Sequence, residues 1–363
     1  MANTINLKIL QWNIRSVRAN KDDLINLIRE KEPDIILLNE TWLNPNFNFH
    51  LNSYNIVRQD RADGYGGVVS CFKKSIIFHT IKKFSSDNIQ YIHCTIGDLN
   101  LINIYSNSGS AFDLAFLDSL IDKISNQKII IMGDLNSHHP MWDKANVNKG
   151  GIIINDFIFK NDLIIKNDGS GTLLQSASNS VSAVDLTIVS SQLAIYSTWE
   201  VINDSGNSDH FPTLLSFQKI NNQSLKSPFI NPYSVRNFKK ADWDLFCEKV
   251  LTHIVLSNSV INYQDLIDII NLAAGESIPP KRCGVPGKLG NVWWDDECSA
   301  FVERRRDALS LFNRYPTIDN FIYAKKIIAV TRKNLRIKKK KNLNYFVKLS
   351  VETPILPTYG TKS

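Results

Sequence analysis

The sequence predicts an α/β domain built as a four-layer sandwich, two mixed β-sheets flanked by helices, with a basic helical extension behind it. Apolar strand-like segments in residues 1–220 are interleaved with amphipathic helical segments, and several strands follow one another directly as hairpins. The strands are too many and too unevenly interleaved with helices for a doubly wound sheet, so two packed sheets with outer helices fit better. Beyond residue 235 the apolar positions recur at helical spacing and basic residues outnumber acidic ones.

The strands and helices of the first domain follow from local patterns. Residues 7–14 (LKILQWNI) are mostly apolar, which is typical of a buried strand. Apolar side chains recur at helical spacing over 21–32, and Pro33 ends that helix before a second buried strand at 34–40. Residues 89–106 are typical of a hairpin that turns at a GDLN tetrapeptide. The other expected segments are strands at 54–59, 66–72, 128–134, 183–191 and 211–217 and a helix at 111–124.

Changes of composition divide the chain into four regions. The mixed pattern of strands and helices covers residues 4–218, and the polar stretch 219–235, which contains two prolines, is typical of a linker. Residues 236–350 are expected to form a basic helical extension, whose last long helix breaks near Pro316. Residues 351–363 are expected to be a disordered tail.

Charge is distributed unevenly along the chain. Residues 1–220 contain 19 Lys and Arg against 22 Asp and Glu, whereas residues 221–363 contain 23 against 13. The basic C-terminal part favours a partner that carries phosphates, such as nucleic acid. A solvated basic helix face is the plain alternative.

Cysteine usage and hydropathy exclude several classes of protein. The five cysteines are scattered and form no CxxC pair, which argues against a zinc ribbon and against a disulfide framework. No run approaches the ~18 apolar residues of a membrane span, and the polar N-terminus lacks the pattern of a signal peptide. We therefore expect an intracellular protein with reduced thiols and no membrane partner.

Chemically capable side chains stand where the apolar strands of the first domain begin or end. They are Asn13, Glu40, Asp134 with Asn136, Asp185, and the cluster Ser208, Asp209 and His210. Taken alone, each is compatible with a turn or a helix cap, as we expect for Asp98 and Asn100 in the first GDLN. Together they indicate a site at the rim of a sheet, where a rigid scaffold presents polar groups to a substrate.

An ordered set of motifs carries a resemblance to a known family. The motifs QWN, NETW, IYSN, GDLNSHHPMWD, VDLTIVSS and SDHFP, in this order and spacing, resemble the endonuclease/exonuclease/phosphatase superfamily. Within it, the chain is most similar to the apurinic-type endonuclease domain of non-LTR (LINE-like, jockey-type) retrotransposons. The resemblance covers about residues 5–217 and implies a DNase-I-like fold. The segments ADWDLF and WWDDECSAFVERRRDAL resemble the part that joins endonuclease to reverse transcriptase in those polyproteins.

The resemblance implies a Mg²⁺ cofactor, with Mn²⁺ as the alternative. Glu40 would be the main ligand, Asn13 would bind beside it, and Asp209 would support the metal or the nucleophile. A hard cation with few protein ligands can also bind an oxygen of the scissile phosphate. Related repair enzymes often carry an Asp two residues after the Asn of the QWN-type motif. Arg15 stands there in this chain, which leaves fewer metal ligands and suggests a contact between Arg15 and the DNA backbone.

The same resemblance implies the catalytic groups. Asp134 would orient or deprotonate the attacking water, or protonate the leaving oxygen, and Asn136 would hold the phosphate or the nucleophile. His210, paired with Asp185, would stabilise the transition state or act as acid or base, because a carboxylate behind an imidazole raises its pKa. Tyr105 would donate a hydrogen bond to the phosphate.

Three further residues are implied as supporting or substrate-binding groups. Ser208 and Thr172 would occupy supporting positions, Thr172 on a looser match of motif. The adjacent His138 and His139 suggest zinc at first sight, but no further ligand of matching spacing accompanies them. His138 is instead expected to shape the rim or to touch the DNA backbone.

The implied function is Mg²⁺-dependent hydrolysis of a DNA phosphodiester that leaves a 3′-hydroxyl, as non-LTR retrotransposons use to nick target DNA. Two alternatives stay open: a phosphomonoesterase of the same fold, and a non-catalytic remnant that binds nucleic acid. DNA is the expected partner, with element RNA or a reverse transcriptase supplied in trans as further ones, and no organic cofactor is expected. Action on chromosomal DNA would place the protein in the nucleus. No polymerase-like motif follows residue 350, so a truncated copy, a partial gene and a stand-alone enzyme are all compatible.

Overall fold

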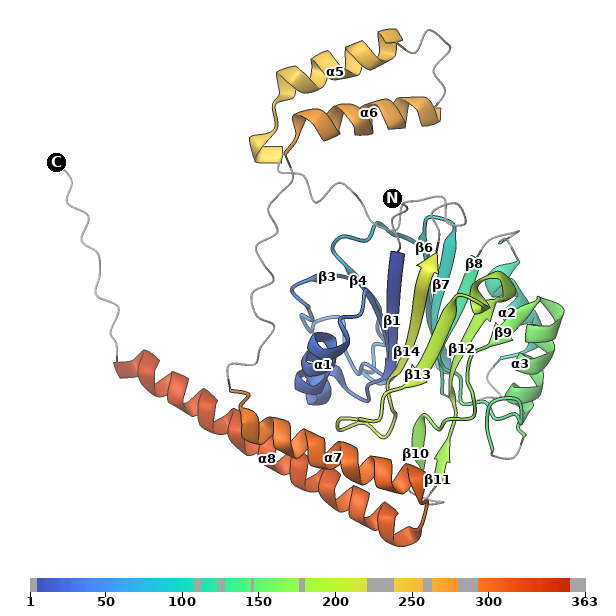
Figure 1. Ribbon diagram of the computed structural model, residues 1–363, viewed down its shortest axis with the longest axis vertical. Coiled ribbons are helices and arrows are strands. Elements are labelled where there is room, and N and C mark those ends of the chain that lie inside the picture. Colours follow the sequence, from blue (N-terminus) through green and yellow to red (C-terminus); the bar gives the residue numbers. More distant parts are fainter. Residues whose placement is uncertain are drawn as a thin grey trace.

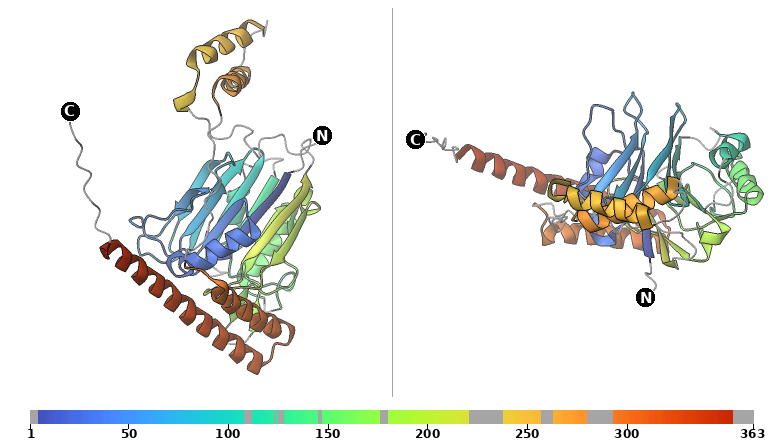
Figure 2. Two further views of the ribbon diagram at one scale, coloured as in Figure 1. Left: turned by 60° about the vertical axis from the view of Figure 1, so that its left-hand side comes forward. Right: turned by 90° about the horizontal axis from the view of Figure 1, so that it is seen from above.

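Two six-stranded sheets lie face to face, with helices on their outer faces (Figure 1). The computed structural model describes residues 5–107, 112–122, 124, 128–144, 147–175, 180–220, 238–256, 263–279 and 293–352. Two further views show the sheets edge-on and the helices outside them (Figure 2). The predicted α/β sandwich of two mixed sheets flanked by helices is confirmed.

Both sheets mix parallel and antiparallel neighbours. The first has the strand order β13-β14-β1-β2-β4-β3 and the second the order β5-β6-β7-β8-β12-β9. The strands of the first sheet are β1 (Ile5–Asn13), β2 (Ile35–Asn39), β3 (Tyr54–Gln59), β4 (Val68–Lys73), β13 (Ser197–Val201) and β14 (Thr213–Ile220). Those of the second are β5 (His79–Ser85), β6 (Ile89–Ile96), β7 (Leu99–Ser106), β8 (Lys128–Asp134), β9 (Leu163–Ile165) and β12 (Asp185–Ser190). A separate ribbon pairs β10 (Leu173–Gln175) with β11 (Ser180–Ser182).

Three apolar clusters hold the four layers together. The inner cluster lies between the sheets and takes Ile9 and Leu37 from the first and Leu101 and Met132 from the second. Helix α1 (Val17–Lys31) packs on the outer face of the first sheet. Helices α2 (Leu114–Ile121) and α3 (Lys149–Lys160) cover the second, and the short α4 (Ser191–Ala194) follows β12. Because the central strands are buried on both faces, they appear in the sequence as apolar runs instead of alternating patterns.

The central strands place the predicted site residues at one end of the sandwich. β1 runs parallel to β2, and β7 runs parallel to β8, so within each pair the carboxyl ends meet at one edge. Asn13 lies opposite Asn39, the residue before Glu40, and Tyr105 lies opposite Asp134. The antiparallel β12 begins at the same edge, where Asp185 pairs with Asp134. The topology therefore brings residues from distant parts of the chain to one rim.

One glycine is required for this arrangement. Gly133 precedes Asp134 in β8 and has a positive φ of 152°. A Cβ atom at this position would lie 1.7 Å from the backbone oxygen of Ile104 in β7. Any larger residue would push β8 away from β7, and Asp134 would move with it.

Several expected segments agree with the structure, and some details differ. The hairpin of β6 and β7 turns at Gly97 as expected, but Asn100 lies within β7, where its side chain contacts His93 Nε2. The expectation that Asn100 is a turn residue was therefore wrong. Helix α1 begins at Val17, earlier than expected, because the Ser16 side chain accepts a hydrogen bond from the backbone of Ala19. The sequence analysis did not anticipate β5, β13 and α3; β5 is exposed along most of its length, so its strand pattern is weak.

The helical extension forms two hairpins. Helices α5 (Trp243–Leu256) and α6 (Tyr263–Ser277) pack against each other after a short 3₁₀ turn, Phe238–Lys240. Helices α7 (Asp296–Arg314) and α8 (Ile318–Glu352) form the second hairpin, which lies along the end of the sandwich that carries β10 and β11 (Figure 1). The chain breaks between α7 and α8 at Pro316, as predicted.

Other sequence expectations concern parts of the chain that the structure describes incompletely. Most of the expected linker (residues 221–235) and of the expected tail (residues 353–363) lies outside the described residues, so the four regional boundaries stay predictions. The cysteines that are described, Cys71, Cys94, Cys247 and Cys298, are free thiols. Within the described ranges no helix is both long and apolar enough to cross a membrane.

Candidate active site

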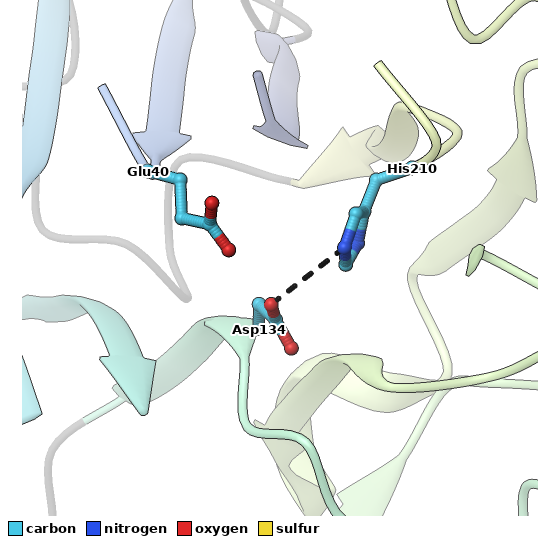
Figure 3. A group of neighbouring side chains, drawn as sticks. All are labelled: Glu40, Asp134 and His210. Carbon is cyan, nitrogen blue, oxygen red and sulfur yellow. Dashed lines mark ion pairs between the residues drawn. The ribbon is translucent and has the colours of Figure 1, made fainter. Parts of the chain in front are cut away.

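Three ionisable side chains converge at the rim formed by the ends of β2, β8 and the segment before β14. Glu40, Asp134 and His210 each offer one ligand atom, and these three atoms lie within 4.8 Å of one another. Figure 3 shows the two carboxylates and the imidazole ring pointing toward a common space. The Nε2 atom of His210 is 3.9 Å from Oδ2 of Asp134. Asp134 and His210 are buried, whereas Glu40 is partly exposed, so the cluster opens to solvent on the Glu40 side.

Asn13 and Tyr105 hold the two carboxylates in place. The amide Nδ2 of Asn13 donates to Glu40 Oε1 at 3.0 Å and to Asp134 Oδ2 at 2.8 Å. The hydroxyl of Tyr105 donates to the same oxygen of Glu40 at 3.2 Å. Burial and the nearby carboxylate of Glu40 raise the pKa of Tyr105, so its hydroxyl keeps the proton and remains a donor.

His210 is oriented by a buried carboxylate. Its Nδ1 atom is 2.8 Å from Oδ2 of Asp185, whose other oxygen accepts from the side chain of Gln11 at 2.9 Å. Burial alone would lower the pKa of His210, but the carboxylates of Asp185, Asp134 and Asp209 raise it to about 10. The ring is therefore an imidazolium at neutral pH, held with its Nε2–H toward the space that the cluster encloses.

Asp134 experiences the opposite balance. Burial raises its pKa to about 8, and Asp185 and Glu40 act in the same direction, while the charge of His210 opposes the shift. The hydrogen bond from Asn13 favours the charged form as well. A cation placed between Glu40 and Asp134 would return the pKa of Asp134 toward its ordinary value, because it replaces the lost solvation.

The backbone is strained at the rim. Four non-glycine residues there have left-handed φ angles between 41° and 50°: Arg15, Glu40, Trp42 and Asn136. Such conformations are uncommon outside glycine and tend to cluster where a side chain must be aimed at a ligand. At Asn136 the turn lets its backbone N–H donate to Asp134 Oδ1 at 3.1 Å, and its side chain donates to the backbone oxygen of Ser106 at 2.8 Å.

Ser208 and Thr172 support the histidine and its carboxylate through the backbone. The Ser208 hydroxyl donates to the backbone oxygen of Asn13 at 2.8 Å and accepts from the backbone of His210 at 3.0 Å. The hydroxyl of Thr172 accepts from the backbone of Asp185 at 3.0 Å. Both hydroxyls are thus positioned to fix the strand ends.

Arg15 and Asp209 lie at the open side of the cluster. The guanidinium of Arg15 forms an ion pair with Asp209, and its Nε atom lies 3.6 Å from Glu40 Oε2. Two carboxylates that the resemblance implies as metal ligands are thus in contact with this arginine, which occupies the place of an expected acid. About 44% of the Arg15 side chain is exposed, so it can exchange these contacts for others.

His138 does not join the cluster. Its Nδ1 atom contacts Oδ2 of Asp143, whose other oxygen accepts from the backbone of Ala183 at 3.1 Å. The pair fixes the loop between β8 and α3. The structure thus brings together the predicted residues at the strand ends and leaves His138 in the adjoining loop.

A buried polar network between the two sheets was missed by the sequence analysis. Gln11 donates to Asn39 Oδ1 at 2.9 Å, Asn39 donates to Asn103 Oδ1 at 2.9 Å, and Thr213 donates to Gln11 Oε1 at 3.0 Å. All four side chains are essentially inaccessible to solvent. Each of these polar residues stands inside an apolar strand, and this pattern could have indicated a buried polar group. The hydrogen-bond partner of each group lies on another strand, so it cannot be predicted from the strand's own sequence.

The chemistry available at this rim is that of phosphate esters. Hard carboxylate oxygens suit a divalent cation such as Mg²⁺, and the imidazolium and the hydroxyl of Tyr105 are donors suited to phosphate oxygens. Asp134 lies between these groups, where it can hold a water molecule or exchange a proton.

The chain is similar in sequence and in fold to known proteins. Over 275 residues the chain is 20% identical to a probable RNA-directed DNA polymerase from transposon X-element of Drosophila melanogaster; the match covers 73% of this chain and 29% of the relative. The chain thus spans less than a third of that relative's length. Among solved structures, the endonuclease domain of TRAS1, a telomere-specific non-LTR retrotransposon, aligns with a TM-score of 0.50 and 17% identity, covering 59% of this chain and 99% of that one.

A further solved structure, the AP endonuclease LMAP from Leishmania major, aligns with a TM-score of 0.49 and 17% identity over 59% of this chain and 88% of its own. The sequence model of one family, described as "Endonuclease/Exonuclease/phosphatase family", matches residues 10–210. This span begins before Asn13 and ends at His210. The motif-based resemblance is thus confirmed, and the TRAS1 domain shares the fold. The chain belongs to the endonuclease/exonuclease/phosphatase family, and is therefore an enzyme that hydrolyses phosphate esters.

Proposed function

We propose that this protein is a Mg²⁺-dependent DNA endonuclease that hydrolyses a phosphodiester and leaves a 3′-hydroxyl. The observation that carries the proposal is the cluster of Glu40, Asp134 and His210, in which two hard carboxylates face an imidazolium across a space that opens to solvent. Similarity to a transposon polymerase and to the endonuclease domain of a retrotransposon supports DNA as the substrate and nicking of target DNA as the role. Element RNA and a reverse transcriptase in trans would then be partners, and the site of action would be the nucleus.

Glu40 would be the principal ligand of the cation, with Asp134 facing it across the site. Asn13 and Asp209 are proposed at its border, although Asn13 presents its amide N–H to both carboxylates and Asp209 is paired with Arg15. Bound there, Mg²⁺ supplies charge neutralisation to a phosphate oxygen. Mn²⁺, which accepts the same oxygen ligands, would substitute for it.

The proton chemistry falls to Asp134 and His210. With Asn136 beside it, Asp134 would be ionised next to the bound cation, so that it would orient the attacking water, take its proton and return that proton to the departing 3′-oxygen. The imidazolium of His210, held by Asp185, would donate its Nε2–H to the phosphate as negative charge accumulates in the transition state. Tyr105 would donate to a second phosphate oxygen once it leaves Glu40.

A plasmid-nicking assay tests the proposal. Wild-type protein should convert supercoiled DNA to the nicked form with Mg²⁺ and should fail in EDTA. The substitutions Glu40→Gln, Asp134→Asn and His210→Gln should each lower the single-turnover rate by at least about 10²-fold, because each removes a charge that acts on the reacting phosphate. His79→Gln, an exposed histidine on β5, serves as the matched control and should stay within about twofold of wild type.

Two further arms identify the product and the substrate class. Nicked plasmid should be extended by a DNA polymerase without phosphatase treatment, which requires a 3′-hydroxyl. Faster turnover of p-nitrophenyl phosphate than of plasmid would instead support the phosphomonoesterase. Nicking that survives all three substitutions would contradict the assignment of the site.

A further inference from the structure

A groove adjoins the candidate active site, and α8 forms one of its walls. Its volume is about 850 Å³. Arg15, just before α1, and Arg18, in its first turn, line the groove together with residues of α8, and Ser208 and Asp209 line it next to the catalytic cluster. The extension and the nuclease domain thus share one concave surface.

The wall contributed by the extension is firmly attached. Arg305 of α7 is 1% exposed; its Nη2 atom donates to Asp23 of α1 at 2.9 Å, and its Nε atom lies 2.8 Å from Asp204 Oδ1. Leu309, Phe312 and Phe321 of the hairpin join an apolar cluster with Leu174 and Phe211 of the nuclease domain. Burying a guanidinium without a carboxylate partner would cost several kcal/mol, so Arg305 favours the position of α7 in which it pairs with Asp23 and Asp204.

The surface of the groove is cationic. Six Arg and Lys side chains line it, against the three carboxylates Asp22, Asp23 and Asp209. Each of these carboxylates already has a cationic partner, namely Lys339, Arg305 and Arg15 in turn. Within the described part of the chain, four lining cations form no ion pair: Arg18, Lys325, Arg332 and Arg336.

Lys325 connects this charge to the catalytic rim. Its side chain is half-buried; burial lowers its pKa, the neighbouring carboxylate of Asp209 raises it, and the charges of Arg332 and Arg15 lower it. Arg332 donates to Oδ1 and to the backbone oxygen of Asn207 at 2.9 and 2.8 Å, in the loop that leads into Ser208. The row of cations on α8 therefore begins next to the loop that carries His210.

Their spacing fits a polymeric anion. Lys325 and Arg336 are eleven residues apart on one helix, which at about 1.5 Å per residue separates them by about 16 Å. One strand of B-DNA carries a phosphate about every 3.4 Å along its axis, so that distance spans about five phosphates. A single phosphate or a small ester could not contact both ends of the row.

We propose that the groove between α1 and α8 binds the phosphate backbone of the substrate DNA beside the scissile phosphate, so that the helical extension is part of the nuclease's substrate-binding surface. The choice of DNA rests on the proposed function, because the row of cations leads into the site where that DNA would be cut. Trp42 and Trp293 also line the groove, where the cations of Arg15 and Lys339 lie over their rings.

The test compares two double variants of the full chain. Lys325→Gln with Arg336→Gln removes two unpaired groove cations and leaves Arg332, which contacts the catalytic loop, unchanged. Arg304→Gln with Lys326→Gln is the control of equal charge, since both side chains are exposed, one on α7 and one on α8, and neither lines the groove. Binding of a labelled DNA duplex in EDTA is measured by fluorescence anisotropy over a range of salt concentrations.

The groove variant should bind DNA about tenfold more weakly at moderate salt, and the slope of log K against log salt should shrink by about 2. The control should match the wild type in both DNA affinity and salt slope. Equal DNA affinity and slope in all three proteins would overturn the proposal, as would a larger loss of affinity for an RNA duplex of the same sequence than for DNA. Weaker DNA binding by the groove variant would support the DNA-binding role of the groove even if the wild type failed to nick plasmid. Binding in EDTA does not depend on catalysis.

Discussion

Asp134 shows at the scale of one residue how a site can work against stability. Its carboxylate is 1% exposed, close to Glu40 and Asp185, and its pKa is raised to about 8. The left-handed φ angles of Glu40 and Asn136 at the same rim also lower the stability of the fold. A buried carboxylate near other carboxylates is costly to ionise, and such arrangements are kept where chemistry needs them.

The pH dependence of stability follows from this shift. Because the pKa of Asp134 rises from 3.8 in the unfolded chain to about 8 in the folded protein, its contribution to stability falls as pH increases between these values. We expect Asp134→Asn, measured by urea unfolding in EDTA, to be more stable than wild type at pH 8 by on the order of 5 kcal/mol, and the gain to vanish near pH 4. His210, whose raised pKa of about 10 adds stability below about pH 6.5, should lose that contribution as pH rises toward 10.

The exposed Asp307→Asn is the control for this series and should change stability by less than about 0.5 kcal/mol at every pH. A stability gain in Asp134→Asn that is the same at pH 4 and pH 8 would show that the carboxylate does not carry the predicted shift.

At the scale of elements, the long basic helix has a structural role as well as a charge. The sequence predicted the break near Pro316 and the basic face of α8, but it contained no sign that α7 docks on α1. The docking depends on Arg305, which pairs with Asp23 and Asp204, and on Arg306, which pairs with Asp204 and Glu30. These partners are far apart in the sequence, so the interface could be found only in the folded chain.

Replacing Arg305 should therefore destabilise the protein strongly. Arg305→Met leaves the buried Asp23 without its cation and leaves Asp204 with Arg306 alone, which we expect to cost about 3–5 kcal/mol in the free energy of unfolding. The neighbouring Arg304→Met, at an exposed position of the same helix, should cost less than about 0.5 kcal/mol. Urea unfolding and limited proteolysis of α7 and α8 would measure both variants, and equal stability of the two would refute the role of the ion pairs.

At the scale of the whole molecule, the candidate site joins the two sheets. Glu40 follows a strand of the first sheet and Asp134 ends a strand of the second, and the network of Gln11, Asn39 and Asn103 links the sheets beneath them. A cation held by both carboxylates would therefore tie the two halves of the sandwich together. Its binding should be visible in global stability and not only in activity.

Thermal unfolding with and without Mg²⁺ measures this linkage. At a concentration about 100 times its Kd, a ligand that binds only the folded state adds about 2.7 kcal/mol, which for a domain of this size raises Tm by about 5–10 °C. Glu40→Gln should lose most of that increase, whereas His79→Gln should keep it, with KCl at equal ionic strength as the reference. An undiminished increase in Glu40→Gln would place the cation elsewhere.

The sequence by itself determined the two-sheet sandwich, the hairpin of β6 and β7, and the residues gathered at the rim, because apolar strands followed by acids and amides leave a local signal and their order resembles one family. The roles of those residues stay predictions. Only the tertiary structure decided that Arg15 contacts Glu40 and Asp209, that His138 pairs with Asp143 away from the cluster, and that α8 forms the wall of a cationic groove. The physical reason is that these features depend on which distant segments come into contact, and contact between distant segments leaves no periodic pattern in either of them.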